Sequence, residues 1–257
     1  MSSVPQCDLD LHSKVRTTIL LGVVLFFAVL PAAAFGQKKF SRTYPGSQNV
    51  RIQLLNRTGT ITVEGWTRSD INIQASLEAP TANIEPQNLS GTIVINLVKD
   101  NQGRSDVGSV NFTIRLPYTA VVDVETMIGN LSVSNIRSGL VRARISSEGD
   151  ITLTNIGAGA VSAENTIGDI FFDGEIQNNG SYRFSSTRGN INLRIPFESS
   201  FRLMATAPSS RSIVLGPFSS ADMSYVGNGR RVVGRFGDGS ATLSVTNQQG
   251  SISFIRR

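Results

Sequence analysis

The sequence contains very few of the side chains that most catalytic and metal-binding sites need. Its 257 residues include one cysteine, Cys7, and one histidine, His12, and both precede a long apolar run. Downstream of that run the chain therefore cannot build a Ser-His-Asp triad, a Cys-His pair, a disulfide, or a zinc site of imidazole or thiolate ligands. Catalysis there would have to use carboxylates, lysine, arginine or tyrosine.

Long hydrophobic runs are also scarce, and the main one lies near the start of the chain. The run 19–30 follows two basic residues and ends at Pro31, ahead of several small residues. This pattern is typical of a secretory signal peptide. We therefore expect residues 1–36 to be a signal peptide, cleaved after Ala34 or Gly36. An uncleaved N-terminal membrane anchor is the alternative, because the segment is nearly as long as the roughly 20 residues that span a bilayer.

Acidic residues are fewer than basic ones, 19 against 24, which gives a formal net charge of +5. A basic exported protein could bind an acidic polysaccharide or an anionic membrane surface. Scattered solubilising charge is the simpler interpretation, because acids lie among the arginines. We expect no nucleic-acid partner, since the chain has no nucleic-acid-binding motif and carries an export signal.

A short unit recurs along the chain: glycine, a small polar residue, an aliphatic residue, a polar residue and an apolar residue. Four copies, at nearly equal spacings of roughly 20 residues, are GNLSV from Gly129, GDITL from Gly149, GDIFF from Gly168 and GNINL from Gly189. Related units begin at Gly59 and Gly250. Because the interval from Gly189 to Gly250 is close to three periods, we expect about three further periods between these two units. A fixed period of this length indicates a repeat architecture.

Apolar and polar residues alternate within each unit, which is typical of a half-buried strand. A second strand-like stretch precedes three of the units, at 140–146, 160–166 and 181–186. Two or three short strands in about 20 residues predict one coil of a single-stranded parallel β-helix, an all-β solenoid. We expect two inward ladders: Ile151 with Ile170 and Ile191, and Leu153 with Phe172 and Leu193. An antiparallel β-sandwich is the alternative, although it does not require the same unit to return in every period.

The remaining segments are less regular. Residues 37–46 are expected to be a linker or a first edge strand, so that the solenoid domain covers 47–257. The stretches 89–98 and 110–116 are expected strands, joined by a polar loop that closes an antiparallel hairpin or projects from a coil. The Gly- and Arg-rich stretch 227–240 is expected to be a protruding turn.

The glycine units behind a signal peptide, together with the sequence IRLPY from Ile114 that returns as LRIPF from Leu193, resemble a known family. This is the bacterial putative-adhesin family of β-strand-repeat proteins, a domain of unknown function related to the head domains of autotransporter adhesins. The resemblance covers about 47–257. It implies a right-handed β-helix-like fold and an exported or envelope-associated protein, with no catalytic residues to carry over. Some relatives are associated with envelope-stress sensing.

Two aspartates of the repeat, Asp150 and Asp169, should stack in adjacent coils about 4.8 Å apart. Carboxylates this close repel each other, and a bound Ca²⁺ would relieve the repulsion. The alternative is that aspartate after glycine supports the corner turn by hydrogen bonding to the local backbone. The backbone role is the simpler interpretation, because the nonapeptide pattern of calcium-binding β-rolls does not occur.

Polysaccharide cleavage would need carboxylates that converge on one groove. The closest approach to such a set is Asp150, Asp169 and Asp173, with Glu148 and Glu164 nearby in the sequence. Corner turns and exposed strand faces account for these acids equally well. We therefore assign no catalytic, cofactor-binding or metal-binding residue and expect no cofactor.

A basic stripe is the other candidate surface. Arg142 and Arg144 lie on one face of an expected strand, with Arg183 and Arg188 two coils later, which would suit an anionic glycan. The chain ends at SFIRR with no second anchor or sorting motif, which favours a periplasmic or secreted location.

The sequence as a whole predicts an exported, non-catalytic, adhesin-like or structural solenoid at the cell envelope. Its partner is an unknown envelope protein or glycan, and the solenoid ends could self-associate, because uncapped coils expose strand edges. The alternatives are a polysaccharide-binding or polysaccharide-cleaving β-helix and a partner protein in envelope-stress sensing.

Overall fold

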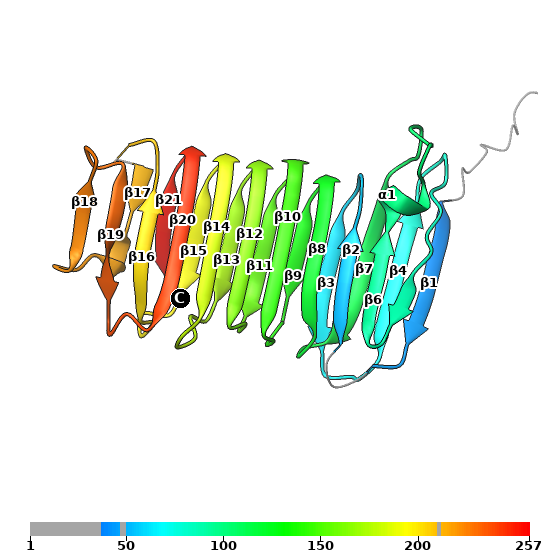
Figure 1. The fold of residues 1–257 in the computed structure, drawn as a ribbon, viewed down its shortest axis with the longest axis horizontal. Coiled ribbons are helices and arrows are strands. Elements are labelled where there is room, and N and C mark those ends of the chain that lie inside the picture. The colour runs from blue at the N-terminus through cyan, green and yellow to red at the C-terminus, as the bar shows by residue number, and fades with distance from the viewer. Residues whose placement is uncertain (1–36, 47–49, 210–211) are drawn as a thin grey trace, which may run out of the picture. The chain divides into compact units, whose positions relative to one another are not determined.

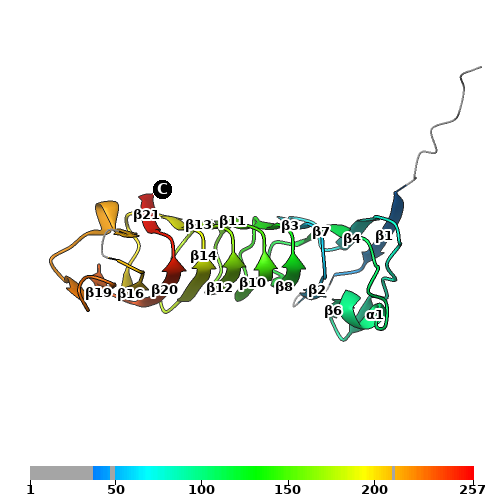
Figure 2. The ribbon, with the colours of Figure 1, turned by 90° about the horizontal axis from the view of Figure 1, so that it is seen from above.

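The computed structural model describes residues 37–46, 50–209 and 212–257, and nearly all of their regular structure is β-strand. Two sheets form two facing layers (Figure 2). The expected signal peptide, its cleavage sites at Ala34 and Gly36, and Cys7 and His12 lie outside the described residues. Within the described ranges, no helix is both long and apolar enough to cross a membrane.

Neighbouring strands of each sheet can be followed in their spatial order in Figure 1. Sheet A consists of β1 (Lys38–Tyr44), β4 (Ile71–Leu77), β7 (Val110–Pro117), β3 (Ile61–Trp66), β9 (Leu131–Ser134), β11 (Ile151–Ile156), β13 (Ile170–Gly174), β15 (Ile191–Ile195), β21 (Ile252–Arg256) and β17 (Ile213–Val214). Sheet B consists of β18 (Met223–Val226), β19 (Arg231–Phe236), β16 (Phe201–Thr206), β20 (Ala241–Gln249), β14 (Ser181–Arg188), β12 (Ala160–Ile167), β10 (Leu140–Glu148), β8 (Val121–Ile128), β2 (Arg51–Leu55), β6 (Thr92–Asn96) and β5 (Gln87–Leu89). Two short helices, α1 (Leu97–Asp100) and η2 (Gly216–Phe218), complete the set.

Strands pair in parallel through the middle of both sheets, from β7 to β17 in sheet A and from β6 to β16 in sheet B. Antiparallel pairs are confined to outer strands: β1, β4 and β7 at one end of sheet A, β5 with β6, and β16, β19 and β18 in sheet B. The expected parallel, solenoid-like arrangement is therefore confirmed for the middle. The antiparallel sandwich is wrong there.

The hydrophobic core lies between the two sheets, and the predicted ladders form it. Ile151, Ile170 and Ile191 are partners on neighbouring strands and are fully buried, as are Leu153, Phe172 and Leu193. From sheet B, the ring of Phe184 packs 5.0 Å from that of Phe172, between centroids. Because one coil cannot bury these side chains alone, stacking of neighbouring strands is what removes them from water.

The two outlying glycine units belong to the same stack as the other four. Ile252, in the unit of Gly250, pairs directly with Ile191 in the unit of Gly189. At the other end Ile61 pairs directly with Leu131, although their units, at Gly59 and Gly129, are far apart in the sequence. The expectation of three further periods before Gly250 is therefore wrong.

Two long insertions explain these large sequence distances. The N-terminal insertion, 67–120, contains β4 to β7, and the C-terminal insertion, 196–240, contains β16 to β19. In Figure 1 the strand β20, in red, lies between β14 and β16 because the chain passes the end of the stack and then returns. Each insertion therefore adds strands outside the first or the last glycine unit.

Two local expectations are corrected inside these insertions. β6 and β7 cannot form a hairpin, because β6 pairs in sheet B and β7 in sheet A, with α1 and a loop between them. The expected protruding turn at 227–240 contains β19, which pairs with β16 along its whole length. Val232 is buried and Arg231 exposed, whereas the rest of the strand, which includes Gly234, shows no clear apolar alternation.

Candidate functional site

A column of six glycines forms the corner where six strands of sheet B turn into the next strand of sheet A; the strands are β2, β8, β10, β12, β14 and β20. Its members, which all have a positive φ between +120° and +148°, are Gly59, Gly129, Gly149, Gly168, Gly189 and Gly250. The N–H of Gly149 donates to the carbonyl oxygen of Ile167 at 2.9 Å, which ties one layer to the next. A Cβ at Gly149 would overlap the carbonyl oxygen of Gly129. Glycine is therefore required here both by its backbone angle and by the close approach of the layers.

The residues that follow these glycines form a second, outer column of hydrogen bonds. Asn130 Oδ1 accepts from the Asp150 N–H at 3.0 Å, and Asp150 Oδ1 accepts from the Asp169 N–H at 2.8 Å. Asp169 Oδ1 accepts from the Asn190 N–H at 2.7 Å, and Asn190 Oδ1 accepts from the Ser251 N–H at 3.1 Å. Each side chain thus holds the backbone of the next layer, whereas the sequence had suggested a bond to the local backbone.

The two stacked carboxylates are therefore explained by their hydrogen bonds to the backbone. Asp150 and Asp169 are both exposed, and each uses one oxygen to hold an amide of the next layer. Among the residues that the structure describes, no group of three or more His, Cys, Asp or Glu side chains could hold a metal ion. Cation binding at this corner stays a hypothesis that a calcium titration can test.

A third column lies inside the same corner and consists of buried polar side chains. Asn165 Nδ2 donates to the carbonyl oxygen of Gly149 at 2.7 Å, and Asn247 Nδ2 donates to that of Gly189 at 2.7 Å. Ser186 Oγ lies 3.4 Å from the carbonyl oxygen of Gly168 and donates to it. Because buried carbonyl groups need partners, these side chains allow the glycine corner to close against the core.

The acids considered for polysaccharide cleavage do not meet at one groove. Asp150 and Asp169 lie at the glycine corner, Glu148 ends β10, and Glu164 lies on sheet B near Arg144, at 3.9 Å. Asp173 lies four residues beyond Asp169 on β13, about 13 Å away at the rise of a strand. The structure thus spreads these carboxylates over separate edges and faces.

Asp173 is the most buried acid of this set, with 3% of its surface exposed. Its carboxylate accepts a short hydrogen bond from Arg194 and lies 3.3 Å from Arg257 Nε. The hydrogen bond to Asp173 raises the pKa of Arg194, which remains charged. Asp173 therefore fastens the last residue of the chain to β13 and β15.

The outer face of sheet B carries alternating charges in its middle strands. The pairs are Arg51 and Arg142 with Asp123, at 2.7 and 2.9 Å, and Arg144 with Glu125 and Glu164, at 3.9 Å each. Three arginines thus face three acids on four neighbouring strands. The predicted basic stripe is consequently neutralised at Arg142 and Arg144, and Arg188 donates to Gln249 Oε1 at 3.3 Å.

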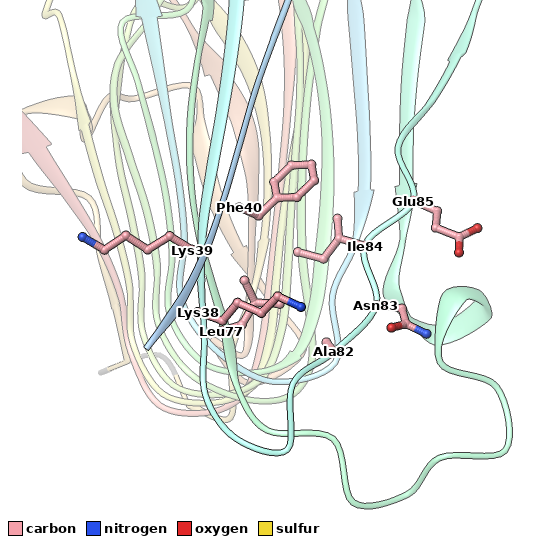
Figure 3. Close-up of a pocket in the computed structure, with 8 residues that line it drawn as sticks. All are labelled: Lys38, Lys39, Phe40, Leu77, Ala82, Asn83, Ile84 and Glu85. Atoms are coloured by element: carbon pink, nitrogen blue, oxygen red, sulfur yellow. The ribbon is translucent and has the colours of Figure 1, made fainter. Parts of the chain in front are cut away.

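A cavity of about 250 Å³ opens at the N-terminal end, between β1 and the segment that follows β4. It is lined by Lys38, Lys39, Phe40, Leu77, Ala82, Asn83, Ile84 and Glu85 (Figure 3). Phe40 and Ile84 pack against the core, whereas Lys39 points away from the other lining side chains. The hollow thus combines an apolar floor with a charged rim, and none of the acids considered for catalysis lines it.

The comparison with known protein families decides which family this arrangement represents. The model of the Toastrack DUF4097 family matches residues 37–254. The chain belongs to the Toastrack DUF4097 family. The match covers every described strand of this Toastrack domain except the end of β21, so the two insertions lie inside the family region.

Solved structures to which the chain is similar come from bacteria. One, described as a putative cell adhesion protein from Clostridium sporogenes, is 12% identical, with a TM-score of 0.47, over 86% of this chain and 100% of that one. Another, described as a putative adhesin from Bacteroides fragilis, is 12% identical, with a TM-score of 0.37, over 87% of this chain and 99% of that one. Among curated proteins no sequence matches the chain significantly.

Two features of the Toastrack domain were missed by sequence reasoning, although one of them leaves a signal there. Asp123 and Glu125 each precede Arg142 and Arg144 by one repeat, so their pairing could have been read from the period. The arginine partners of Asp173 leave no such signal. Arg257 reaches Asp173 only because β21 pairs with β15 after the long C-terminal insertion.

Proposed function

We propose that this Toastrack chain is an exported, non-catalytic interaction protein of the bacterial cell envelope, adhesin-like or structural in role. One observation carries the proposal: outward polar residues are stacked in register over many strands, which gives two broad faces. Ser132 lies beside Thr152 on sheet A, and Ser185 beside Thr246 on sheet B. Solenoid proteins use their extended surfaces for binding.

The proposed architecture is a right-handed solenoid with coils of about 20 residues. Strand partners in the middle of the stack support the coil length, because Leu140 pairs with Ala160 and Ala160 with Ser181, each a step of one period. The proposed domains are a signal peptide at 1–36, a linker or first edge strand at 37–46 and the solenoid at 47–257. The start of the family match at residue 37 supports a boundary after residue 36.

Cell fractionation tests this proposal. We expect the full chain, with a C-terminal tag, to appear in the periplasmic, secreted or envelope fraction and to begin after Ala34 or Gly36. A variant that lacks residues 2–36 should stay in the cytoplasm, because the export signal is gone. A full chain that remains cytoplasmic contradicts the proposed location.

The non-catalytic role has its own test. We expect the purified protein to bind envelope material without releasing reducing sugar from acidic polysaccharides. Turnover that increases in proportion to the protein concentration, and that is lost on substitution of Asp150, Asp169 or Asp173, would identify a polysaccharide-cleaving enzyme instead.

A further inference from the structure

Four exposed arginines gather on the outer face of sheet B near its C-terminal end. They lie on β14, β16 and β19 and are Arg183, Arg202, Arg231 and Arg235. We call this set the C-terminal arginine patch. Three of its four members belong to the C-terminal insertion.

The strand register places two of these arginines against each other. Arg202 on β16 is the direct antiparallel partner of Arg235 on β19. Side chains that oppose each other in this way start about 4.5–5.5 Å apart, and like charges in such positions are destabilising. In the middle of the same face the corresponding partners are opposite charges, since Arg142 lies beside Asp123. The patch thus pairs like charges across neighbouring strands, whereas the middle strands pair opposite charges.

The acids beside the patch only partly compensate for its charge. Asp222 lies 3.8 Å from Arg235, but both side chains are more than half exposed, at 64% and 55%, so this ion pair is weak. Asp238 uses Oδ1 to accept from the Ser240 N–H at 2.9 Å, which is the main reason why its pKa is lowered. Four arginines thus stand against two aspartates, whereas three arginines face three acids in the middle strands.

The strand positions between the arginines are rich in neutral hydrogen-bonding groups. Thr242 is the parallel partner of Arg202, and Ser244 is the partner of Arg183. A hollow of about 390 Å³ lies beside Arg202 and is lined by Asn179, Arg202, Asp238, Gly239, Ser240 and Thr242. This surface offers guanidinium groups for anions together with hydroxyl and amide groups for polar partners.

We propose that the C-terminal arginine patch binds an acidic polysaccharide, whose carboxylate groups sit between Arg202 and Arg235 and whose hydroxyl groups meet the neighbouring Ser and Thr side chains. A carboxylate between the two guanidinium groups would accept a charge-assisted hydrogen bond from each of them and would offset their like charges. A polyhydroxylated polymer fits the Ser and Thr positions better than a lipid headgroup layer does. The proposal rests on the interaction role proposed above and names the ligand class for it.

Binding of the full chain to polygalacturonate, measured by calorimetry at low salt, tests this proposal. We expect binding that weakens with salt, because exposed charges are screened. Arg202→Gln/Arg235→Gln should lower the affinity about tenfold or more, which corresponds to roughly 1.4 kcal/mol. The matched control, Arg142→Gln/Arg144→Gln, removes the same charge from arginines that already have acidic partners. It should change the affinity less than about twofold.

Folding is checked by thermal melting of both variants. We expect Arg202→Gln/Arg235→Gln to melt at or above the wild-type temperature, since it removes like charges from directly opposed strand positions. Arg202→Lys/Arg235→Lys should retain part of the binding, because lysine keeps the charge but loses the planar donor geometry.

Three results would overturn the proposal. One is an absence of polygalacturonate binding by the wild type at low salt, and another is an equal loss of affinity in the control variant, which would show a general charge effect. The third is preferential binding to phosphatidylglycerol vesicles over the polymer, which would identify a lipid surface. Fractionation that still places the chain outside the cytoplasm would leave the proposed function standing in each case.

Discussion

The middle of the solenoid and its two ends share the same glycine corner. They differ in how far apart neighbouring layers lie in the sequence. Between β8 and β15 each layer follows the previous one after one period, and inward side chains stack on equivalent side chains. At the ends the next glycine unit, at Gly59 or Gly250, lies at least three periods away in the sequence. A long excursion of the chain is therefore tolerated, provided that it returns to the glycine column.

The same two regions differ in their surface charge. The middle strands of sheet B match each arginine with an acid, so this face is nearly neutral. The C-terminal insertion instead places Arg202 opposite Arg235. The repeat therefore forms a nearly neutral frame, and the inserted strands add the basic surface.

Replacing a glycine of the corner column should give the largest effect on stability. Gly149→Ala forces a side chain into a backbone with φ of +144° and against the carbonyl oxygen of Gly129. We expect a loss of about 3–4 kcal/mol in the free energy of unfolding, measured with urea. Gly227→Ala, in an open turn of the C-terminal insertion with φ of +64°, should cost only about 1 kcal/mol. Equal costs at the two sites would show that the column is not a close contact between layers.

Removal of the buried acid should have the next largest effect. Asp173→Ala leaves Arg194 and Arg257 without their shared carboxylate and opens a small void at a position that is 3% exposed. We expect a loss of about 2 kcal/mol in urea denaturation. Asp222→Ala, which removes an exposed ion pair at the C-terminal end, should change stability by less than about 0.5 kcal/mol. An Asp173→Ala variant with an unchanged free energy of unfolding would contradict the assigned role of this ion pair.

The outer hydrogen-bond column should contribute a smaller amount. Asp150→Ala removes the acceptor that holds the Asp169 N–H at 2.8 Å. We expect a cost of about 1 kcal/mol, of which Asp150→Asn should restore about half, because an amide oxygen can also accept. Asp106→Ala, at an exposed loop position, is the control and should leave the unfolding curve unchanged. If Asp150→Asn and Asp150→Ala are equally destabilising, the carboxylate charge rather than its hydrogen bond matters.

Calcium should have the smallest effect. Because Asp150 and Asp169 each already hold a backbone amide, we expect millimolar Ca²⁺ to shift the melting temperature by less than about 1 °C. Magnesium at the same concentration is the control for ionic strength. A saturable rise with Ca²⁺ that disappears in Asp169→Asn would establish the cation site instead.

The sequence predicted the part of the fold in which its own period is visible. The inward ladder of Ile151, Ile170 and Ile191 is confirmed, because alternation and spacing both follow from the stacking of equal coils. The predicted position of Gly250 in the stack was wrong, because the number of residues between two glycine units does not give the number of layers between them. An insertion therefore looks like additional coils in the sequence. β19 was missed because Gly234 and two arginines weaken the apolar alternation that marks a strand.

The candidate surfaces were predictable only where neighbouring strands are one period apart. The neutralisation of Arg142 by Asp123 follows from their separation by one period. The pairing of Arg202 with Arg235 depends on an antiparallel register inside an insertion, which no repeat spacing encodes. The hydrogen bonds between the corner aspartates and the next layer likewise could not be predicted from the sequence, because they depend on the direction of the side chains.

Disulfide crosslinking measures most directly whether the ends are insertions into one continuous stack. In a Cys7→Ser background, Asn192→Cys/Ser253→Cys joins direct partners on β15 and β21, whereas Ser132→Cys/Asn192→Cys joins positions three strands apart in sheet A. Neighbouring strands lie about 4.8 Å apart, within the reach of a disulfide, and three steps lie beyond it. We expect the first pair to form an intrachain disulfide on oxidation and the second to remain reduced. A folded protein in which the first pair fails to crosslink would contradict the continuous stack.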